Sequence, residues 1–142
     1  MPATVRHMLR GKSTIYSVGS DDTVLSALRL MSDRNIGAVL VLRDDKVEGI
    51  LSERDYARKV ILLGKRSEET LVSEIMTTKV VVVEPEWTAE QCMALMTDKR
   101  VRHLPVMERE RLIGVISIGD VVRAVVEEQQ FHIRSLERYI SS

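Results

Sequence analysis

The sequence predicts an α+β fold built from two pseudo-symmetric copies of one β-α-β-β-α unit that pack through their sheets. The chain has 142 residues, of which 44% are hydrophobic, enough to form a shared core. Residues 15–59 align without a gap with residues 80–124, and hydrophobic positions agree along both copies. Within each copy the hydrophobic period alternates between that of strands and that of helices. Because three strands and two helices leave one sheet face uncovered, two such units are expected to cover each other.

A seven-residue pattern, Gly-h-h-Ser-x-x-Asp with h a hydrophobic residue, recurs near the end of each copy. It reads GILSERD at residues 49–55 and GVISIGD at residues 114–120. Two further segments resemble each other and precede the copies; these leading segments are Val5–Leu9 and Val72–Met76. We therefore divide the chain into a first domain at 5–62, a linker at 63–71, a second domain at 72–126 and a C-terminal helical extension at 127–142.

Each copy begins with a short β segment that is followed by a helix. The β segments are predicted at Ile15–Val18 and Val80–Val83, and the second consists of four valines, which favour strands. Thr88 and Gln91 form a capping box that marks the start of the second helix. The helices place apolar residues at positions i, i+3, i+4 and i+7: Val24, Ala27, Leu28 and Met31 in one copy, and Ala89, Cys92, Met93 and Met96 in the other.

A hairpin and a second helix complete each copy. The closing helices begin near Ser52 and Ser117, and the second is expected to continue through Ile140 as one long or broken helix. The predicted hairpin strands are Ala38–Leu42 with Val47–Leu51 and His103–Met107 with Leu112–Ile116. Four later apolar residues are expected to dock on the module or on a second subunit: Phe131, Ile133, Leu136 and Ile140.

The composition argues against several classes of protein. The chain carries 21 basic and 21 acidic residues, whereas a nucleic-acid-binding surface usually brings a basic excess. It contains no apolar run of the length that a signal peptide or a membrane-spanning helix requires. Its one cysteine, Cys92, excludes an intramolecular disulfide. We therefore expect a cytoplasmic protein that binds neither nucleic acid nor membrane.

Catalytic and metal chemistry find little support in the sequence. His7, His103 and His132 are scattered and lack the spacing of metal ligands. Cys92 lies on the apolar face of a predicted helix, so it is expected to be buried rather than to act as a nucleophile. Neither a P-loop nor a GxGxxG pattern occurs. The expectation is a protein that is not an enzyme and has no metal site.

The repeated serine and aspartate admit two interpretations. Unpaired N–H groups at a helix start attract anions, and the aspartate one turn later could accept hydrogen bonds from ribose hydroxyls, so together they could bind a nucleotide. Ser-x-x-Asp is equally a capping motif that closes a helix start. Duplication does not decide between them, because a duplicated fold also repeats its caps.

The repeat resembles a tandem pair of cystathionine-beta-synthase (CBS) domains, called a Bateman module. The resemblance covers residues 5 to about 126 and rests on the order and double occurrence of several segments. These are the leading segments, the helix ends Leu30-Met31 and Leu95-Met96, the run Val101–Val106 and both Gly-h-h-Ser-x-x-Asp patterns. Within these residues no further domain accompanies the pair, so the chain is similar to stand-alone modules of that family.

The resemblance implies a regulatory protein for energy or redox sensing. Such modules bind AMP, ADP or ATP, and in some cases NAD(H) or S-adenosylmethionine, between the two repeats. The resemblance also implies a homodimer that signals to a protein effector. A ligand-free structural or adaptor dimer on the same fold is the alternative.

The same resemblance implies which residues contact the ligand. Asp55 and Asp120 are the expected ribose binders, and Ser52 and Ser117 are the expected phosphate-side hydroxyls. The start of each first strand, at 14–16 and 79–81, would present main chain to an adenine edge. The full expected set is Ser52, Arg54, Asp55, Lys79, Val80, Val81, Arg102, His103, Pro105, Ser117 and Asp120.

The two copies differ in the basic residues near these positions. Arg102 and His103 interrupt an apolar run in the second copy, where the first copy is apolar. The first copy has Arg54 and Arg58 on its closing helix instead. We therefore expect the second site to be the better equipped for phosphate.

Overall fold

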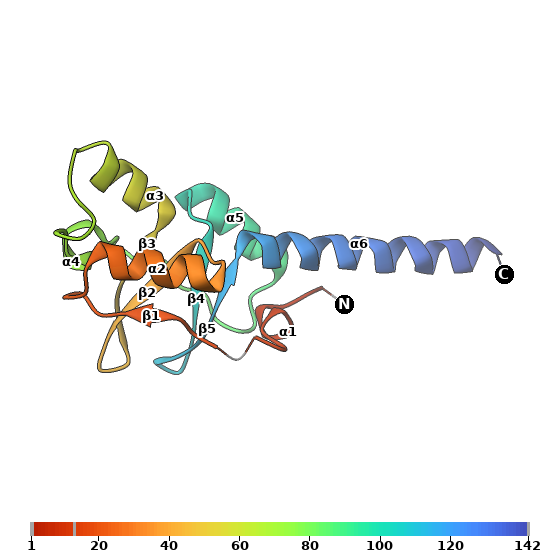
Figure 1. Cartoon of the computed structure of the whole chain (residues 1–142). Coiled ribbons are helices and arrows are strands. Elements are labelled where there is room, and N and C mark those ends of the chain that lie inside the picture. The colour runs from red at the N-terminus through yellow and green to blue at the C-terminus, as the bar shows by residue number, and fades with distance from the viewer. Residues whose placement is uncertain (1, 13, 142) are drawn as a thin grey trace. The chain divides into compact units, whose positions relative to one another are not determined.

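The computed structural model describes residues 2–12 and 14–141, which form two compact units. One unit comprises residues 14–80, and we call it the first-repeat unit. The other combines residues 2–12 with residues 81–141, and we call it the second-repeat unit. Helices and two small sheets make up the described residues, which confirms the predicted α+β class (Figure 1).

The first-repeat unit is built on a three-stranded sheet in the order β1-β2-β3. β1 (Ser17–Val18) runs parallel to β2 (Ala38–Arg43), and β2 pairs antiparallel with β3 (Lys46–Ser52). The intervening helix α2 (Val24–Arg34) turns the chain back, which gives the parallel pairing of β1 and β2. The expected strand at Ile15–Val18 is thus shortened to its last two residues.

Local signals explain where α2 begins and ends. The Thr23 hydroxyl accepts a hydrogen bond from the Ser26 backbone N–H, which is a standard N-cap. Asn35 closes the helix in the left-handed conformation at φ 54°, a geometry that asparagine tolerates better than most residues. The buried residues of α2 are Val24, Ala27 and Met31, which are members of the predicted apolar stripe.

The closing helix of the first-repeat unit changes its hydrogen-bond spacing after one turn. α3 (Glu53–Tyr56) is followed directly by the π-helical segment η1 (Ala57–Ile61). Val60 in η1 is fully buried. One wider turn shifts the side chains that follow it around the helix axis, and π-helical turns of this kind often occur at functional sites.

The second-repeat unit has a two-stranded sheet. β4 (His103–Glu108) pairs antiparallel with β5 (Arg111–Ser117), and this hairpin has the same register shift as its counterpart in the first repeat. α5 (Ala89–Lys99) precedes the hairpin and α6 (Ile118–Ser141) follows it as one uninterrupted helix (Figure 1). Cys92 and Met96 from α5 and Val121 and Ala124 from α6 share one core.

The expected strand at Val80–Val83 is wrong as an extended element. It is reduced to a single parallel bridge between Val83 and Val106. On one side of this bridge, the Val80 N–H turns back to the Thr78 carbonyl. On the other side, the carbonyls at residues 85 and 87 accept hydrogen bonds from the N-terminal helix rather than from β4. Four consecutive valines favour a strand, but these competing backbone partners leave only one residue to pair.

The leading segments pack on the unit formed by the other repeat. α1 (Val5–Met8) belongs to the second-repeat unit, where the Val5 N–H donates to the Trp87 carbonyl at 2.8 Å. α4 (Val72–Ile75) belongs to the first-repeat unit, where the Val72 N–H donates to the Asp22 carbonyl at 2.8 Å. Val5 and Val72 are both fully buried. Each unit is therefore completed by the leading segment that the sequence places before the other repeat.

Candidate ligand-binding sites at two Ser-x-x-Asp helix starts

Both Ser-x-x-Asp patterns lie at a helix start and bond reciprocally. Ser52 N–H donates to the Asp55 carboxylate at 3.0 Å, and Asp55 N–H donates to the Ser52 hydroxyl at 3.2 Å. Ser117 and Asp120 repeat the arrangement at 2.8 and 3.2 Å. The capping interpretation of the pattern is therefore correct for both copies. Capping uses Oδ2 of each aspartate, and Oδ1 has other partners; in Asp120, Lys12 also contacts the capping oxygen.

Asp120 is a buried carboxylate held by two cations. The residue is 8% exposed. Lys12 Nζ lies 2.5 Å from Oδ2, and an Arg123 guanidinium nitrogen lies 2.7 Å from Oδ1. Burial by itself raises the pKa of the Asp120 carboxyl, but hydrogen bonds from Lys12 and the Ser117 backbone outweigh it and hold that pKa below its usual range. Asp120 is therefore a negative charge fixed at the start of α6.

Asp55 has a related environment. Lys59 Nζ, one turn along the same helical segment, lies 3.3 Å from Oδ1. The Thr77 hydroxyl donates to the same oxygen at 3.2 Å. Lys59 also donates to the Ile75 carbonyl at 3.0 Å, so it ties α4 to the closing helix. Each aspartate is thus faced by a lysine, and Asp120 is also paired with Arg123.

The sheet register places a different residue beside each serine. His103 is the cross-strand partner of Ser117, whereas Ala38 is the partner of Ser52. The adjacent Arg102 is exposed, and its carbonyl accepts a hydrogen bond from the Ile118 N–H at 2.8 Å, which fixes it at the α6 start. A donor-bearing side chain is therefore paired across the strands with Ser117, whereas an alanine is paired with Ser52. That the second site is the better equipped for phosphate stays a prediction.

The remaining expected site residues are more dispersed. Pro105 is buried in β4, and its carbonyl accepts a hydrogen bond from the Val83 N–H. Arg54 is exposed on α3. Lys79 and Val80 fall in the first-repeat unit, whereas Val81 falls in the second-repeat unit with Asp120. The structure describes each unit by itself, so the expected contribution of residues 79–81 to one site stays a prediction.

Several site residues were not found from the sequence. Lys59 follows Asp55 by four positions and Arg123 follows Asp120 by three, so helical spacing could have identified both. Lys12 and Thr77 reach their aspartates through the fold, and no local pattern marks them. The Arg34 guanidinium lies 5.3 Å from the centre of the Tyr16 ring, within the segment expected to face adenine.

A hollow of about 720 Å³ opens between α2 and α3 of the first-repeat unit. Its lining is mixed, with Leu28, Met31, Ile36 and Tyr56 beside the polar Ser32, Asn35 and Glu53. Ser52 and Asp55 are not among the lining residues.

Metal binding, cysteine reactivity and membrane insertion can each be checked against the described residues. Within 2–12 and 14–141, no group of three or more His, Cys, Asp or Glu side chains could hold a metal ion. Burial raises the pKa of the Cys92 thiol to about 11, so this thiol is mostly protonated at neutral pH. Over the same residues, every helix is too short or too polar to cross a bilayer.

The repeated hairpins, their flanking helices and the paired aspartates define a tandem CBS-domain protein. The CBS domain family model matches residues 8–61 and 72–127, so the chain belongs to the CBS-domain family. The resemblance on which the sequence analysis rested is thereby confirmed.

Relatives and solved structures agree with this assignment. CBS domain-containing protein CBSX3, mitochondrial, from Arabidopsis thaliana is 44% identical over 126 residues, 85% of this chain and 61% of that protein. This chain therefore spans about three fifths of that relative's length. CBS domain-containing protein YhcV from Bacillus subtilis is 32% identical over 107 residues, 75% of this chain and 76% of that protein. A structure of a CBS-domain containing protein from Agrobacterium tumefaciens has 40% identity and a TM-score of 0.82, covering 86% of this chain and 98% of its own.

Proposed function

We propose that the chain is a regulatory module that binds an adenosine-containing ligand at its Ser-x-x-Asp helix starts and signals to a partner protein. The ligand class comprises AMP, ADP, ATP, NAD(H) and S-adenosylmethionine. The observation that carries the proposal is Asp120, a buried carboxylate with a lowered pKa at the start of a helix. Two vicinal ribose hydroxyls are donors suited to such a group.

One structural neighbour supports the ligand class only through the shared fold. The CBS domain pair of protein MJ0100 was solved in complex with 5'-methylthioadenosine and S-adenosyl-L-methionine. It has a TM-score of 0.80 at 19% identity, so its ligands are properties of that protein. The proposal for this chain rests on the family and on its own aspartates.

The cations around Asp120 suggest how a ligand would enter. Side chains of Lys12 and Arg123 are 43% and 70% exposed, so both can swing away at modest cost. Ribose hydroxyls could then take their places on the two oxygens and keep the buried carboxylate satisfied. The displaced cations, with Arg102, would lie near the phosphates and favour a nucleotide over a nucleoside.

This exchange also offers a route for signalling. Lys12 belongs to the N-terminal segment, and its contact with Asp120 fastens that segment to the start of α6. Ligand binding would release Lys12 and loosen the attachment. A protein effector that contacts either segment would then sense the ligand.

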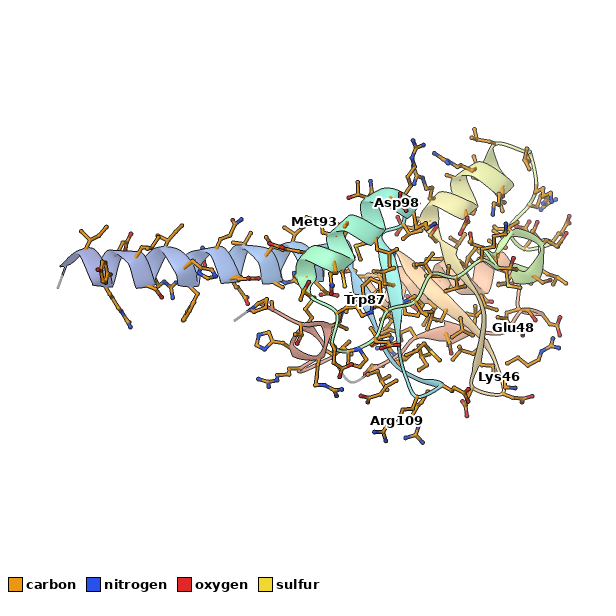
Figure 2. All side chains as sticks on the ribbon, turned by 180° about the vertical axis from the view of Figure 1, so that it is seen from behind. Lys46, Glu48, Trp87, Met93, Asp98 and Arg109 are labelled. Atoms are coloured by element: carbon orange, nitrogen blue, oxygen red, sulfur yellow. The ribbon has the colours of Figure 1, made fainter. Side chains whose placement is uncertain are left out.

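Calorimetric titration with adenosine, AMP, ADP, ATP, NAD(H) and S-adenosylmethionine tests the proposal. Asp120→Asn should lose roughly 1.5–3 kcal/mol of affinity, the value of hydrogen bonds to a charged group. Asp98→Asn is the matched control, because that carboxylate lies on α5 and is 75% exposed (Figure 2). Equal affinities for Asp120→Asn and the wild type would exclude Asp120 as the ribose contact.

The variant Lys12→Met tests whether ribose displaces Lys12 from Asp120 or whether Lys12 only attracts the phosphates of the ligand. If ribose displaces Lys12, this variant should bind adenosine at least as tightly as the wild type and ATP more weakly. Arg102→Ala should likewise weaken ATP and AMP far more than adenosine. A uniform loss across the three ligands would point to a role in folding for either residue.

The ligand-free structural or adaptor dimer is the second candidate. One observation favours it: both aspartates already have partners within the protein and complete a helix cap. Saturating concentrations of every ligand above, without heat of binding or a thermal shift in a folded sample, would support this alternative.

Further parts of the proposal concern catalysis, assembly and location. We propose a module that is not an enzyme and that forms a homodimer through its helices. A cytoplasmic location stays a prediction, since the printed name of the Arabidopsis relative describes that protein as mitochondrial. Fractionation of cells expressing the tagged chain tests the location.

A further inference from the structure

Helix α6 carries two apolar stripes rather than one. The first consists of Val121, Ala124 and Val125, which pack in the core of the second-repeat unit. The second begins at Val122 and Val126, which are 45% and 44% exposed although they lie in the same turns. At about 100° per residue, the two stripes are centred roughly a third of a turn apart. The core therefore does not account for the second stripe.

The second stripe continues along the whole exposed half of the helix. Ile133, Leu136 and Ile140 extend it, and each is more than half exposed. Every residue from 129 to 140 is exposed, and Figure 2 shows this part of α6 extending away from the other elements of the second-repeat unit. A helix end that only meets water gains nothing from such a row of apolar residues.

The spacing of this stripe is that of a coiled coil. Its positions are 122, 126, 129, 133, 136 and 140, so the steps alternate between four and three residues. This is the a/d pattern of a heptad repeat, with Val126, Ile133 and Ile140 at a and Val122, Gln129 and Leu136 at d. All charged residues between Val122 and Ile140 lie off the stripe.

We propose that this stripe is the seam of a parallel, in-register, two-stranded coiled coil between the α6 helices of two copies of this chain. β-branched residues at a, combined with leucine at d, favour two strands over three or four in parallel coiled coils. Here a carries valine and isoleucine, and the last d position carries Leu136. The occupant of the stripe is therefore a second copy of the same helix.

Gln129 determines the orientation of the two helices. In a parallel pair it faces Gln129 of the second copy, so the two amides can hydrogen-bond to each other within the seam. In an antiparallel pair that overlaps the whole stripe, a positions face d positions and Gln129 would face Ile133, which leaves the amide unpaired. A single polar seam residue thus selects the parallel register.

The flanking residues agree with this arrangement. In the parallel register His132 at g lies near Glu137 at e of the second copy, where an imidazole N–H can donate to the carboxylate. The seam from Val122 to Ile140 is roughly 27 Å long, which is marginal for an isolated helix pair. The burial of Val121 and Ala124 compensates, because it fixes the first turns of α6, in which the seam begins.

Cysteine cross-linking in the full chain tests both the seam and its direction. The native Cys92 is fully buried, so we do not expect it to form disulfides that would interfere with the assay. In Leu136→Cys the two introduced thiols should face each other in the parallel seam and form a disulfide-linked dimer under mild oxidation. Arg138→Cys is the control, because position 138 lies on the outer side of the same turn and should cross-link at least tenfold more slowly.

The outcomes separate the possibilities. Rapid cross-linking of Leu136→Cys alone supports the parallel seam. Equal rates for the two variants, or no cross-linking of either, overturn it. Cross-linking of a Val122→Cys/Ile140→Cys double variant only between unlike positions, read by mass spectrometry, would show an antiparallel pair and also overturn it. None of these measurements requires a ligand, so they are independent of the proposed nucleotide site.

Discussion

Gly49 and Gly114 occupy the same place in the two repeats but meet different neighbours. A Cβ built on Gly49 would lie 2.8 Å from the Thr77 backbone carbonyl oxygen and 2.9 Å from the Met76 sulfur. A Cβ on Gly114 would lie 2.7 Å from a terminal methyl of Leu9. A backbone carbonyl bonded to a neighbouring strand cannot move easily, whereas a leucine side chain can change rotamer.

We therefore expect Gly49→Ala to be the more damaging substitution. It should lower the free energy of unfolding by roughly 1–3 kcal/mol, the usual cost of overpacking, and Gly114→Ala should cost less. Urea denaturation of the two full-length variants measures the difference. An equal or larger loss for Gly114→Ala would show that Leu9 is held as firmly as the backbone at Thr77.

The lowered pKa of Asp120 predicts a pH-dependent contribution to stability. A carboxyl whose pKa is lower in the folded state stabilises the fold above its unfolded pKa of about 3.9. This contribution is lost as the pH falls through the lower, folded value. The stability difference between wild type and Asp120→Asn should thus be constant above about pH 5 and shrink as the pH falls below about 4.

Denaturation midpoints at several pH values measure this difference, with Asp98→Asn as the exposed control. A difference that grew on acidification would contradict the assignment of Lys12 and the Ser117 backbone as the groups that stabilise the ionised form. The comparison uses differences between variants, so the titration of other carboxyls largely cancels.

At the scale of elements, the two leading helices offer the sharpest comparison. α1 and α4 have similar sequences, and each contributes one fully buried valine, Val5 or Val72. Val5 packs with the core of the second-repeat unit and Val72 with that of the first-repeat unit. Each helix therefore stabilises the unit that contains the other repeat.

Val5→Ala and Val72→Ala should each cost roughly 1.5–3 kcal/mol through lost burial and a residual cavity. Hydrogen exchange followed by mass spectrometry can locate each effect. Val5→Ala should raise exchange in α5 and β4, whereas Val72→Ala should raise it in α2 and β2. The opposite pattern would mean that each leading helix packs on the repeat that directly follows it.

The distal half of α6 determines what truncation should do to the whole molecule. Because residues 129–140 are all exposed, removing residues 131–142 takes little buried surface from a single copy. The truncated chain should therefore keep its circular dichroism signature and its ligand binding. It should dimerise more weakly than the full chain, which light scattering across a concentration series would detect.

Light scattering on the full-length and truncated chains can also contradict the proposed dimer. A full-length chain that stays monomeric at high micromolar concentration would exclude the homodimer. A truncated chain as dimeric and as heat-stable as the full chain would confine the dimer contact to other helices and leave the distal α6 as a solvated extension.

The sequence by itself determined the features that depend on neighbouring residues. Periodicity placed the helices and hairpins, the Ser-x-x-Asp spacing located both closing-helix starts, and the gapless repeat identified two related units. These signals are readable because hydrophobic period, caps and turns act over a few residues. The same local character explains why Lys59 and Arg123 could have been found beside their aspartates.

The tertiary structure alone decided the features that depend on distant partners. The four valines at 80–83 form only one bridge because the carbonyls that follow pair with α1, and no local pattern contains that competition. The packing of α1 and α4 on the opposite repeat and the reach of Lys12 to Asp120, 108 positions away, have the same origin. Two similar leading segments have equal local preferences, so only the shape of the available core and the path of the chain determine where each one packs.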